Sequence, residues 1–295
     1  MTILQAAILG LVQGLAEFLP ISSSGHLILA RAVMGISEAA TESASYMMLD
    51  ILLHAGTLIA VLVVFWKDWW NILRNPFKSK TLLLLFIASI PALIVAMAFN
   101  DVVESFFSGW FLGFAFLITA LFMLLAQWAS RRGGKHAVRM GDANYKHAVS
   151  MGCMQAVALL PGVSRSGSTI LGGVASGLTR QAAAKFAFMM SAPAILGSLL
   201  IEGKKAMDNG YFQSLETVPV AVGVVVAAVS GYLAIRFMLS IITRISLKWF
   251  ALYAALVGIV VLVLQLTMPG FLPPLAFPSL EGTVRALFPF MGMGA

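Results

Sequence analysis

Six apolar runs, each long enough to cross a lipid bilayer as a helix, dominate this sequence. They cover residues 47–66, 82–99, 110–129, 182–201, 217–240 and 249–267. A transmembrane helix needs about 20 mainly apolar residues. Only 11% of the 295 residues are charged, whereas a soluble domain has roughly 25%. The sequence therefore predicts an all-α polytopic membrane protein with about six transmembrane helices.

Two further apolar segments, residues 5–29 and 148–178, are each interrupted by a polar run. The first contains P-I-S-S-S-G-H and the second contains P-G-V-S-R-S-G-S-T. Non-helical backbone at membrane depth is tolerated only where it is buried in protein or lines a wet cavity. We therefore expect two re-entrant helical hairpins, each of which points its break towards the interior of the protein.

Basic residues are unevenly divided between the connections. Eleven Lys and Arg residues lie in three of them, 67–80, 130–146 and 241–248. Three lie in the alternate set, 30–46, 100–109 and 202–216. Connections that carry more Lys and Arg usually face the cytoplasm. The pattern predicts that the first set is cytoplasmic and that both chain ends lie outside.

The two broken segments resemble each other. A shift of 142 positions aligns residues 5–29 with the second segment and gives nine identities in 25 positions. Each segment is followed by three predicted spans, so the second copy would have inverted topology. Inverted repeats with broken helices place a polar site near the bilayer midplane. We expect repeat one to cover about 5–129 and repeat two about 148–267.

The remaining features limit the class of protein. Residues 1–267 are predicted to form one integral membrane domain, and 268–295 a Pro-rich apolar tail that lies at the interface. No Lys or Arg precedes Arg31, so a cleavable signal peptide is not expected. Cys153 is the single cysteine, which excludes an intrachain disulfide. The net charge of +7 includes no basic run with interleaved aromatics, so no nucleic-acid partner is expected.

The polar breaks have the composition of an anion site. A new helix is expected to begin at about Gly25 and at about Gly167. The N-terminus of a helix carries unpaired N–H groups and a partial positive charge, and it favours anions. Arg165 adds a planar donor fork that suits phosphate. An arginine within the membrane is by default a functional hypothesis.

The first broken segment adds reactive groups. Gln13 and Glu17 are four residues apart and so share a helix face. The oxygen atoms of Glu17 suit a hard cation such as Mg²⁺ or Ca²⁺. Ser22, Ser23 and Ser24 are possible nucleophiles, with His26 close behind them in the sequence. A histidine beside a serine can activate it for attack on phosphorus.

Structural interpretations compete with these roles. Glu17 and Arg165 could form a buried ion pair, the serines could act only as helix caps, and His26 could pack. His54 is interpreted as a hydrogen-bonded packing residue. Asp50 could equally be a hydrated residue near the outer end of its span or a member of the site.

Two long motifs resemble one family. The run Q-G-L-A-E-F-L-P-I-S-S-S-G-H, from Gln13 to His26, is similar to a signature of bacterial undecaprenyl-pyrophosphate phosphatases. The run P-G-V-S-R-S-G-S-T, from Pro161 to Thr169, resembles that family's second signature. The segments that begin D-I-L-L-H-A-G and F-M-M-S-A-P also look like parts of this family. The resemblance runs from about residue 4 to about 267, and the family is linked to bacitracin resistance.

The resemblance implies a function and a site. Undecaprenyl (C55) pyrophosphate would be hydrolysed to the monophosphate and inorganic phosphate, with a divalent cation, to recycle the lipid carrier of the bacterial cell wall. The protein would lie in the bacterial inner membrane, with its site open to the outer face and a homo-oligomer as one option for assembly. Glu17 would act on metal or water, Ser23 would be the nucleophile and His26 its partner. Gln13 stands where some members have Glu, so the motif carries one carboxylate. The phosphate-binding set would be Gln13, Ser22, Ser24, Ser164, Arg165, Ser166 and Thr169.

Other functions remain as alternatives. A lipid-phosphate transporter or flippase would need the same anion site, but it would not need a reactive serine. A membrane lipid phosphatase with a histidine nucleophile shares the short element Ser24-Gly25-His26, but its later histidine is missing after Arg165. A purely structural role is disfavoured by the cost of Glu17 and Arg165 in hydrocarbon.

Overall fold

Six long helices form the body of the protein in this computed structural model. The structure describes residues 1–36, 44–98, 110–133, 136–210, 216–268 and 270–273. The named elements among these residues are all helices, and Val138 and Leu178 form an isolated β-bridge. The six long helices are α4 (Ala44–Val64), α6 (Lys80–Ala98), α8 (Leu112–Gly133), α11 (Arg180–Asp208), α12 (Thr217–Ile241) and α13 (Lys248–Thr267). All are long and apolar enough to cross a membrane, which confirms the predicted class and the six spans.

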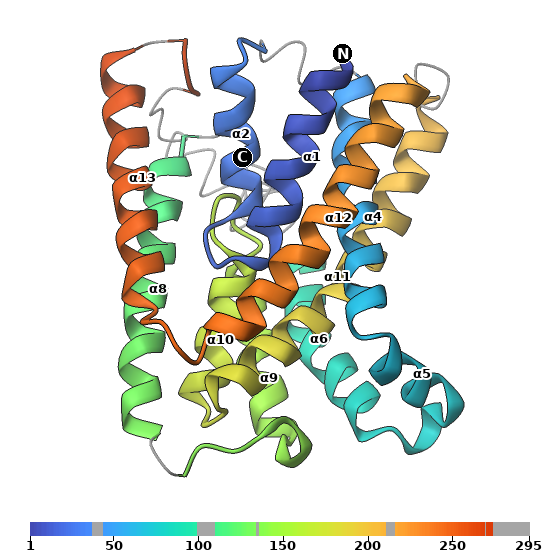
Figure 1. The fold of residues 1–295 in the computed structure, drawn as a ribbon, viewed down its shortest axis with the longest axis vertical. Coiled ribbons are helices and arrows are strands. Elements are labelled where there is room, and N and C mark those ends of the chain that lie inside the picture. The colour runs from blue at the N-terminus through green and yellow to red at the C-terminus, as the bar shows by residue number, and fades with distance from the viewer. Residues whose placement is uncertain (37–43, 99–109, 134–135, 211–215, 269, 274–295) are drawn as a thin grey trace, which may run out of the picture.

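The two interrupted segments each form a pair of short helices. The first pair is α1 (Ile3–Phe18) and α2 (Ser23–Val33), and the second is α9 (Tyr145–Val157) and α10 (Arg165–Ala175). Figure 1 shows the pairs entering from opposite ends of the molecule, with their turns close together near the middle. The helix breaks thus lie where the polar runs predicted them. The re-entrant path through a membrane and the inverted topology stay predictions.

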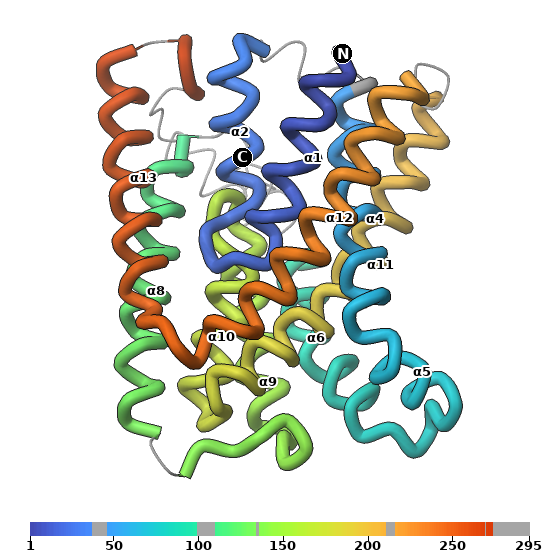
Figure 2. The backbone as a smooth tube through the Cα atoms, in the orientation of Figure 1, coloured from blue at the N-terminus to red at the C-terminus, as the bar shows by residue number. Residues whose placement is uncertain are grey.

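Short helices cover one end of the molecule. Helix α5 (Trp66–Arg74) and the 3₁₀ turn η1 (Pro76–Lys78) connect α4 to α6, and η3 (Met140–Asp142) precedes α9. In Figure 2 the connections α4–α6, α8–α9 and α12–α13 all lie towards the same end of the molecule. These connections hold the basic residues that predict a cytoplasmic face. Much of the connections at the opposite end, and most of the tail 268–295, lie outside the described residues. The predicted position of the tail at the membrane interface therefore also lies outside them.

Helices of the two halves pack reciprocally. The first helix of each half lies against the second long helix of the other, α1 on α12 and α9 on α6. In addition, α8 packs on α13, and these are the third long helices of the two halves. Helix α4 packs on α11, and these are the first long helices. A two-fold relation between the halves would produce these pairings, and the inverted repeat itself stays a prediction.

Two glycines at corresponding positions permit the closest of these contacts. A Cβ atom on Gly10 of α1 would lie 2.3 Å from the carbonyl oxygen of Gly223 in α12. A Cβ atom on Gly152 of α9 would lie 2.5 Å from the carbonyl oxygen of Ala88 in α6. Small residues let membrane helices approach at backbone distance, where van der Waals packing holds them. The contact fixes α1, which carries Gln13 and Glu17, against a long helix of the other half.

Candidate active site

The two central turns are capped in the same way by serine. Ser22 precedes α2 and its hydroxyl accepts a hydrogen bond from the Gly25 N–H at 3.3 Å. Ser164 precedes α10 and accepts from the Gly167 N–H at 3.1 Å. A side-chain oxygen at this position satisfies one of the unpaired N–H groups of the first turn. Both helices therefore begin at the middle of the molecule, as the sequence predicted.

The cap at Ser22 has an unusual backbone conformation. Its φ is 76°, in the left-handed region, while Ser164 has an ordinary φ of −67°. A residue other than glycine held in such a region costs on the order of 1–3 kcal/mol and persists where its surroundings fix it. Ser22 is buried and its carbonyl accepts from the His26 ring, so the turn before α2 is held on both sides.

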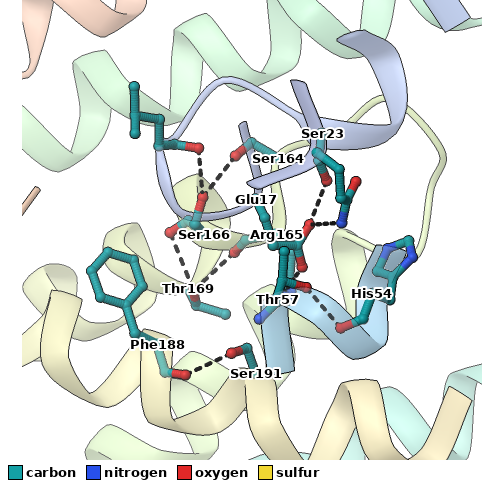
Figure 3. A network of polar contacts seen from close by, with 12 residues as sticks. Glu17, Ser23, His54, Thr57, Ser164, Arg165, Ser166, Thr169, Phe188 and Ser191 are labelled. Atoms are coloured by element: carbon teal, nitrogen blue, oxygen red, sulfur yellow. Dashed lines mark hydrogen bonds and ion pairs between the residues drawn. The ribbon is translucent and has the colours of Figure 1, made fainter. Parts of the chain in front are cut away.

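The Glu17 carboxylate is the centre of the polar network in Figure 3. One of its oxygens, Oε1, pairs with the Arg165 guanidinium. The other, Oε2, accepts from the Ser23 hydroxyl at 2.5 Å and from the Gln13 side-chain amide at 3.3 Å. Glu17 is buried, and Arg165 keeps a side-chain exposure of 20%. The ion pair of the structural interpretation is thus present. The Ser23 hydroxyl, a possible nucleophile, bonds to the same Glu17 carboxylate.

Other hydroxyl groups hold the two turns together. Ser24 accepts from the Gly162 N–H at 3.2 Å, and Ser166 donates to the carbonyl of Leu19 at 2.9 Å. Ser166 also lies 3.2 Å from the Ser164 hydroxyl. The Ser24–Gly162 and Ser166–Leu19 bonds join the first broken segment to the second. The serines therefore have structural partners as well as a place beside the anion site.

A small cavity of about 150 Å³ opens beside Glu17. Six of the predicted site residues line it: Glu17, Ser23, Ser24, Ser164, Arg165 and Ser166. Gln13, Ser22 and Thr169 do not. Gln13 touches the site through Glu17, Ser22 serves as a cap, and the Thr169 hydroxyl donates to the Arg165 and Ser166 carbonyls of its own helix.

The structure does not bring His26 to Ser23. The Nδ1–H of His26 donates to the Ser22 carbonyl at 2.7 Å, and its Nε2 lies 2.7 Å from the Tyr253 hydroxyl. The ring also stacks on that of Tyr253 in α13 and meets Phe116 of α8 edge-on. Both ring nitrogens are therefore occupied. In the described structure His26 thus has partners other than Ser23, and its predicted role beside Ser23 stays a prediction.

The histidine that lines the cavity is His54 of α4. Its Nδ1 is 2.8 Å from the Asp50 carbonyl, one turn earlier, and the Asp50 side chain pairs with Arg31 of α2. The sequence alone predicts a hydrogen-bonded packing role for His54, whereas the structure also places it on the cavity wall. The signal that could have found it is the four-residue spacing of Asp50 and His54, which puts two polar groups on one face of an apolar helix.

The arrangement is suited to a phosphate group and permits a hard cation. Two helix N-termini and Arg165 face the cavity, and this is the environment that binds anions. Among the described residues no three His, Cys, Asp or Glu side chains gather as a metal site. The buried Oε1 of Gln13, however, has no hydrogen-bond partner there. One carboxylate and one amide oxygen fit Mg²⁺, which takes its other ligands from water and phosphate.

Comparison with known proteins gives one consistent result. The family described as bacitracin resistance protein BacA matches residues 6–260. An undecaprenyl-diphosphatase 4 of Bacillus thuringiensis subsp. konkukian is 40% identical over 265 residues, which is 90% of this chain and 98% of that protein. The undecaprenyl-diphosphatase of Carboxydothermus hydrogenoformans is 39% identical over 88% of this chain and 97% of its own. That of Halothermothrix orenii is 37% identical over 90% and 98%.

Proposed function

Because this chain belongs to the bacitracin resistance protein BacA family, we propose that it hydrolyses undecaprenyl pyrophosphate to undecaprenyl phosphate and inorganic phosphate. The observation that carries the proposal is the Glu17 carboxylate, which contacts both the Ser23 hydroxyl and the Arg165 guanidinium beside the central cavity. A phosphatase needs a nucleophile, an acid–base group and a cation at one place, and these three residues supply them.

Arg165 and the two helix N-termini bind the terminal phosphate. The guanidinium offers donors in a fixed fork that matches phosphate oxygens. The partial positive charges at the starts of α2 and α10 add to it. Ser24, Ser164 and Ser166 place further hydroxyl groups on the cavity wall. These groups stabilise the charge on the equatorial oxygens of phosphorus, which is the main task in phosphoryl transfer.

Ser23 is the nucleophile and Glu17 is its base. The Ser23 oxygen forms a bond to the terminal phosphorus, and its proton passes to the Glu17 oxygen that lies 2.5 Å away. The bond between that phosphorus and the bridging oxygen breaks, and its electron pair leaves with undecaprenyl phosphate. A phosphoserine remains, and water must hydrolyse it to complete the cycle. Glu17 then returns its proton to the serine oxygen.

A divalent cation, Mg²⁺ or Ca²⁺, is part of the proposal. Glu17 and the Gln13 amide oxygen would hold it together with substrate oxygens. Bound there, it would neutralise negative charge on the pyrophosphate. Phosphate release should stop in excess EDTA and return when Mg²⁺ or Ca²⁺ is added back. If excess EDTA leaves the rate of phosphate release unchanged, the proposed cation is rejected.

The protein is a multi-pass membrane protein, and we propose that its central cavity opens to the outer face of the bacterial inner membrane. The helix pair α1–α2 enters from the end opposite the basic connections (Figure 1). Since basic connections favour the cytoplasm, that end is the outer one. The lipid tail of the substrate would then lie in the surrounding bilayer.

The test is phosphate release by the purified protein in detergent with undecaprenyl pyrophosphate. Wild type should release phosphate, and S23A, E17A and R165A should lose nearly all of the activity at matched folding. S89A is the control serine variant, because the Ser89 hydroxyl bonds only to a carbonyl of its own helix α6 in the described structure. Absence of release from folded wild type would reject the proposed function.

The comparisons give no support to the transporter alternative. The same assay separates the two, since a transporter has no need of the Ser23 hydroxyl. A folded S23A protein that moves lipid phosphate across vesicle membranes, while wild type releases no phosphate, would reverse the conclusion.

A further inference from the structure

His54 lies in the cavity with the reacting groups but has no part in the mechanism so far. It projects from α4, whereas Glu17, Ser23 and Arg165 come from α1, α2 and α10. Figure 3 shows its ring in the neighbourhood of these three side chains. Histidine is the side chain that most often acts as a general acid or base in enzymes, and His54 is the one histidine among the described residues that line the cavity.

The hydrogen bond of His54 selects the tautomer of its ring. A carbonyl oxygen can only accept, so Nδ1 carries the proton that is donated to Asp50 at 2.8 Å. In the neutral ring the lone pair then resides on Nε2. Among the described residues the ring makes its hydrogen bond through Nδ1 alone. Nε2 is therefore the atom that can take a proton.

The surroundings of His54 hold it in this state. The Asp50 side chain pairs with Arg31 of α2, so the residue that accepts from the ring is itself fixed. One turn further along, the buried Thr57 hydroxyl donates to the carbonyl of His54 at 2.8 Å. A base whose tautomer is set by a second group is the recurring arrangement in nucleophilic and hydrolytic sites.

We propose that His54 is the general base for the water that hydrolyses the phosphoserine on Ser23. Glu17 is already bonded to the Ser23 hydroxyl and takes part in the first step, so the second step needs another base. The water oxygen forms a bond to phosphorus and its proton passes to Nε2 of His54. The bond from phosphorus to the serine oxygen breaks, and that oxygen recovers the proton held by Glu17. Inorganic phosphate leaves, and His54 then loses its proton to solvent.

This inference rests on the proposed function, and it predicts a trapped intermediate. H54N keeps a side-chain N–H that can reach the Asp50 carbonyl but lacks the Nε2 base. Loss of general-base catalysis lowers a rate by about 10²–10⁴-fold. We expect H54N to release phosphate at least about 100-fold more slowly than wild type and to accumulate phosphoserine at Ser23.

The experiment uses undecaprenyl pyrophosphate labelled in its terminal phosphate, an acid quench and location of the protein-bound label by peptide mapping. H54Q is the second variant, in case H54N folds poorly, and S23A/H54N should carry no label. H136Q is the matched control, because His136 is exposed in the connection before α9.

Each outcome decides the matter. Label on Ser23 in H54N or H54Q, with slow release, supports the role. Release at the wild-type rate, or loss of release with no label in either folded variant, overturns it. Wild type that releases no phosphate at all would instead reject the proposed function, so the two failures can be told apart.

Discussion

Ser23 and Arg165 occupy corresponding positions in the two broken segments, and both contact the carboxylate of Glu17. Each is the first residue of an 11-residue helix that follows a serine cap, and they are 142 positions apart. The same backbone feature therefore delivers a hydroxyl from one half and a cation from the other. Neither half contains a complete site, because Glu17 and Ser23 need the arginine of the second half.

Replacing Arg165 with lysine should impair catalysis although the charge is kept. Lysine is a point charge and cannot reproduce the planar fork that binds phosphate and the Glu17 carboxylate together. We expect R165K to lower kcat/KM by about 10²–10³-fold, comparable to the loss of one oxyanion donor. Steady-state phosphate release measures it, with R236A on the exposed face of α12 as the control. Near-wild-type kinetics of R165K would contradict the role of the fork.

The Glu17–Arg165 pair should couple strongly in stability. Removing one partner leaves the other charge buried, which costs about 3–5 kcal/mol. We expect E17Q and R165M each to lower the thermal midpoint in detergent. The double variant should lose less than the sum of the single losses, because no unpaired charge remains. Strictly additive losses would mean that the two charges do not stabilise each other.

Alanine at Gly10 should loosen α1 from α12. Its Cβ would meet the Gly223 carbonyl at 2.3 Å, so the backbones must separate. Overpacking of this kind costs typically 1–3 kcal/mol, and we expect G10A to lower the thermal midpoint. The control is G197A in α11, where a Cβ meets nothing within 4 Å. Since alanine favours helix over glycine, G197A should keep or raise the midpoint.

Phenylalanine at Tyr253 tests the position of His26. Y253F removes the hydroxyl that lies 2.7 Å from Nε2 of His26 and keeps the stacked ring. We expect a stability loss of about 0.5–1.5 kcal/mol, the usual net value of one hydrogen bond, with phosphate release per folded molecule unchanged. In a double-mutant cycle with H26Q the losses should be less than additive. A fall in the rate of Y253F without a stability change would return His26 to the chemistry.

The sequence predicts the fold class well because the bilayer restricts it. Apolar runs of about 20 residues have one stable form in lipid, so the six spans could be read directly. The helix breaks were equally readable, since Pro, Gly and Ser interrupt both segments at corresponding places. Glu17 and Arg165 could be identified because ionised groups are rare at such depth.

The contacts between distant elements could not be predicted in the same way. His26 follows Ser23 by three residues, but its ring bonds to Tyr253, 227 residues further along, and it is not among the residues that line the cavity. His54 lies inside an apolar helix, and nothing local shows that α4 passes beside the turns of α1–α2 and α9–α10. Long-range packing decides which of two histidines faces the site.

The distance along the chain between Glu17 and Arg165 also sets a schedule for biosynthesis. The two residues are 148 positions apart, so at about 5–20 residues per second the ribosome adds the arginine roughly 7–30 s after the acid. During that interval Glu17 lacks the Arg165 guanidinium, its ion-pair partner in the described structure. We expect α1 and α2 to remain at the membrane surface, or to keep Glu17 protonated, until the second helix pair emerges. Final docking of the N-terminal segment is then a late event in assembly.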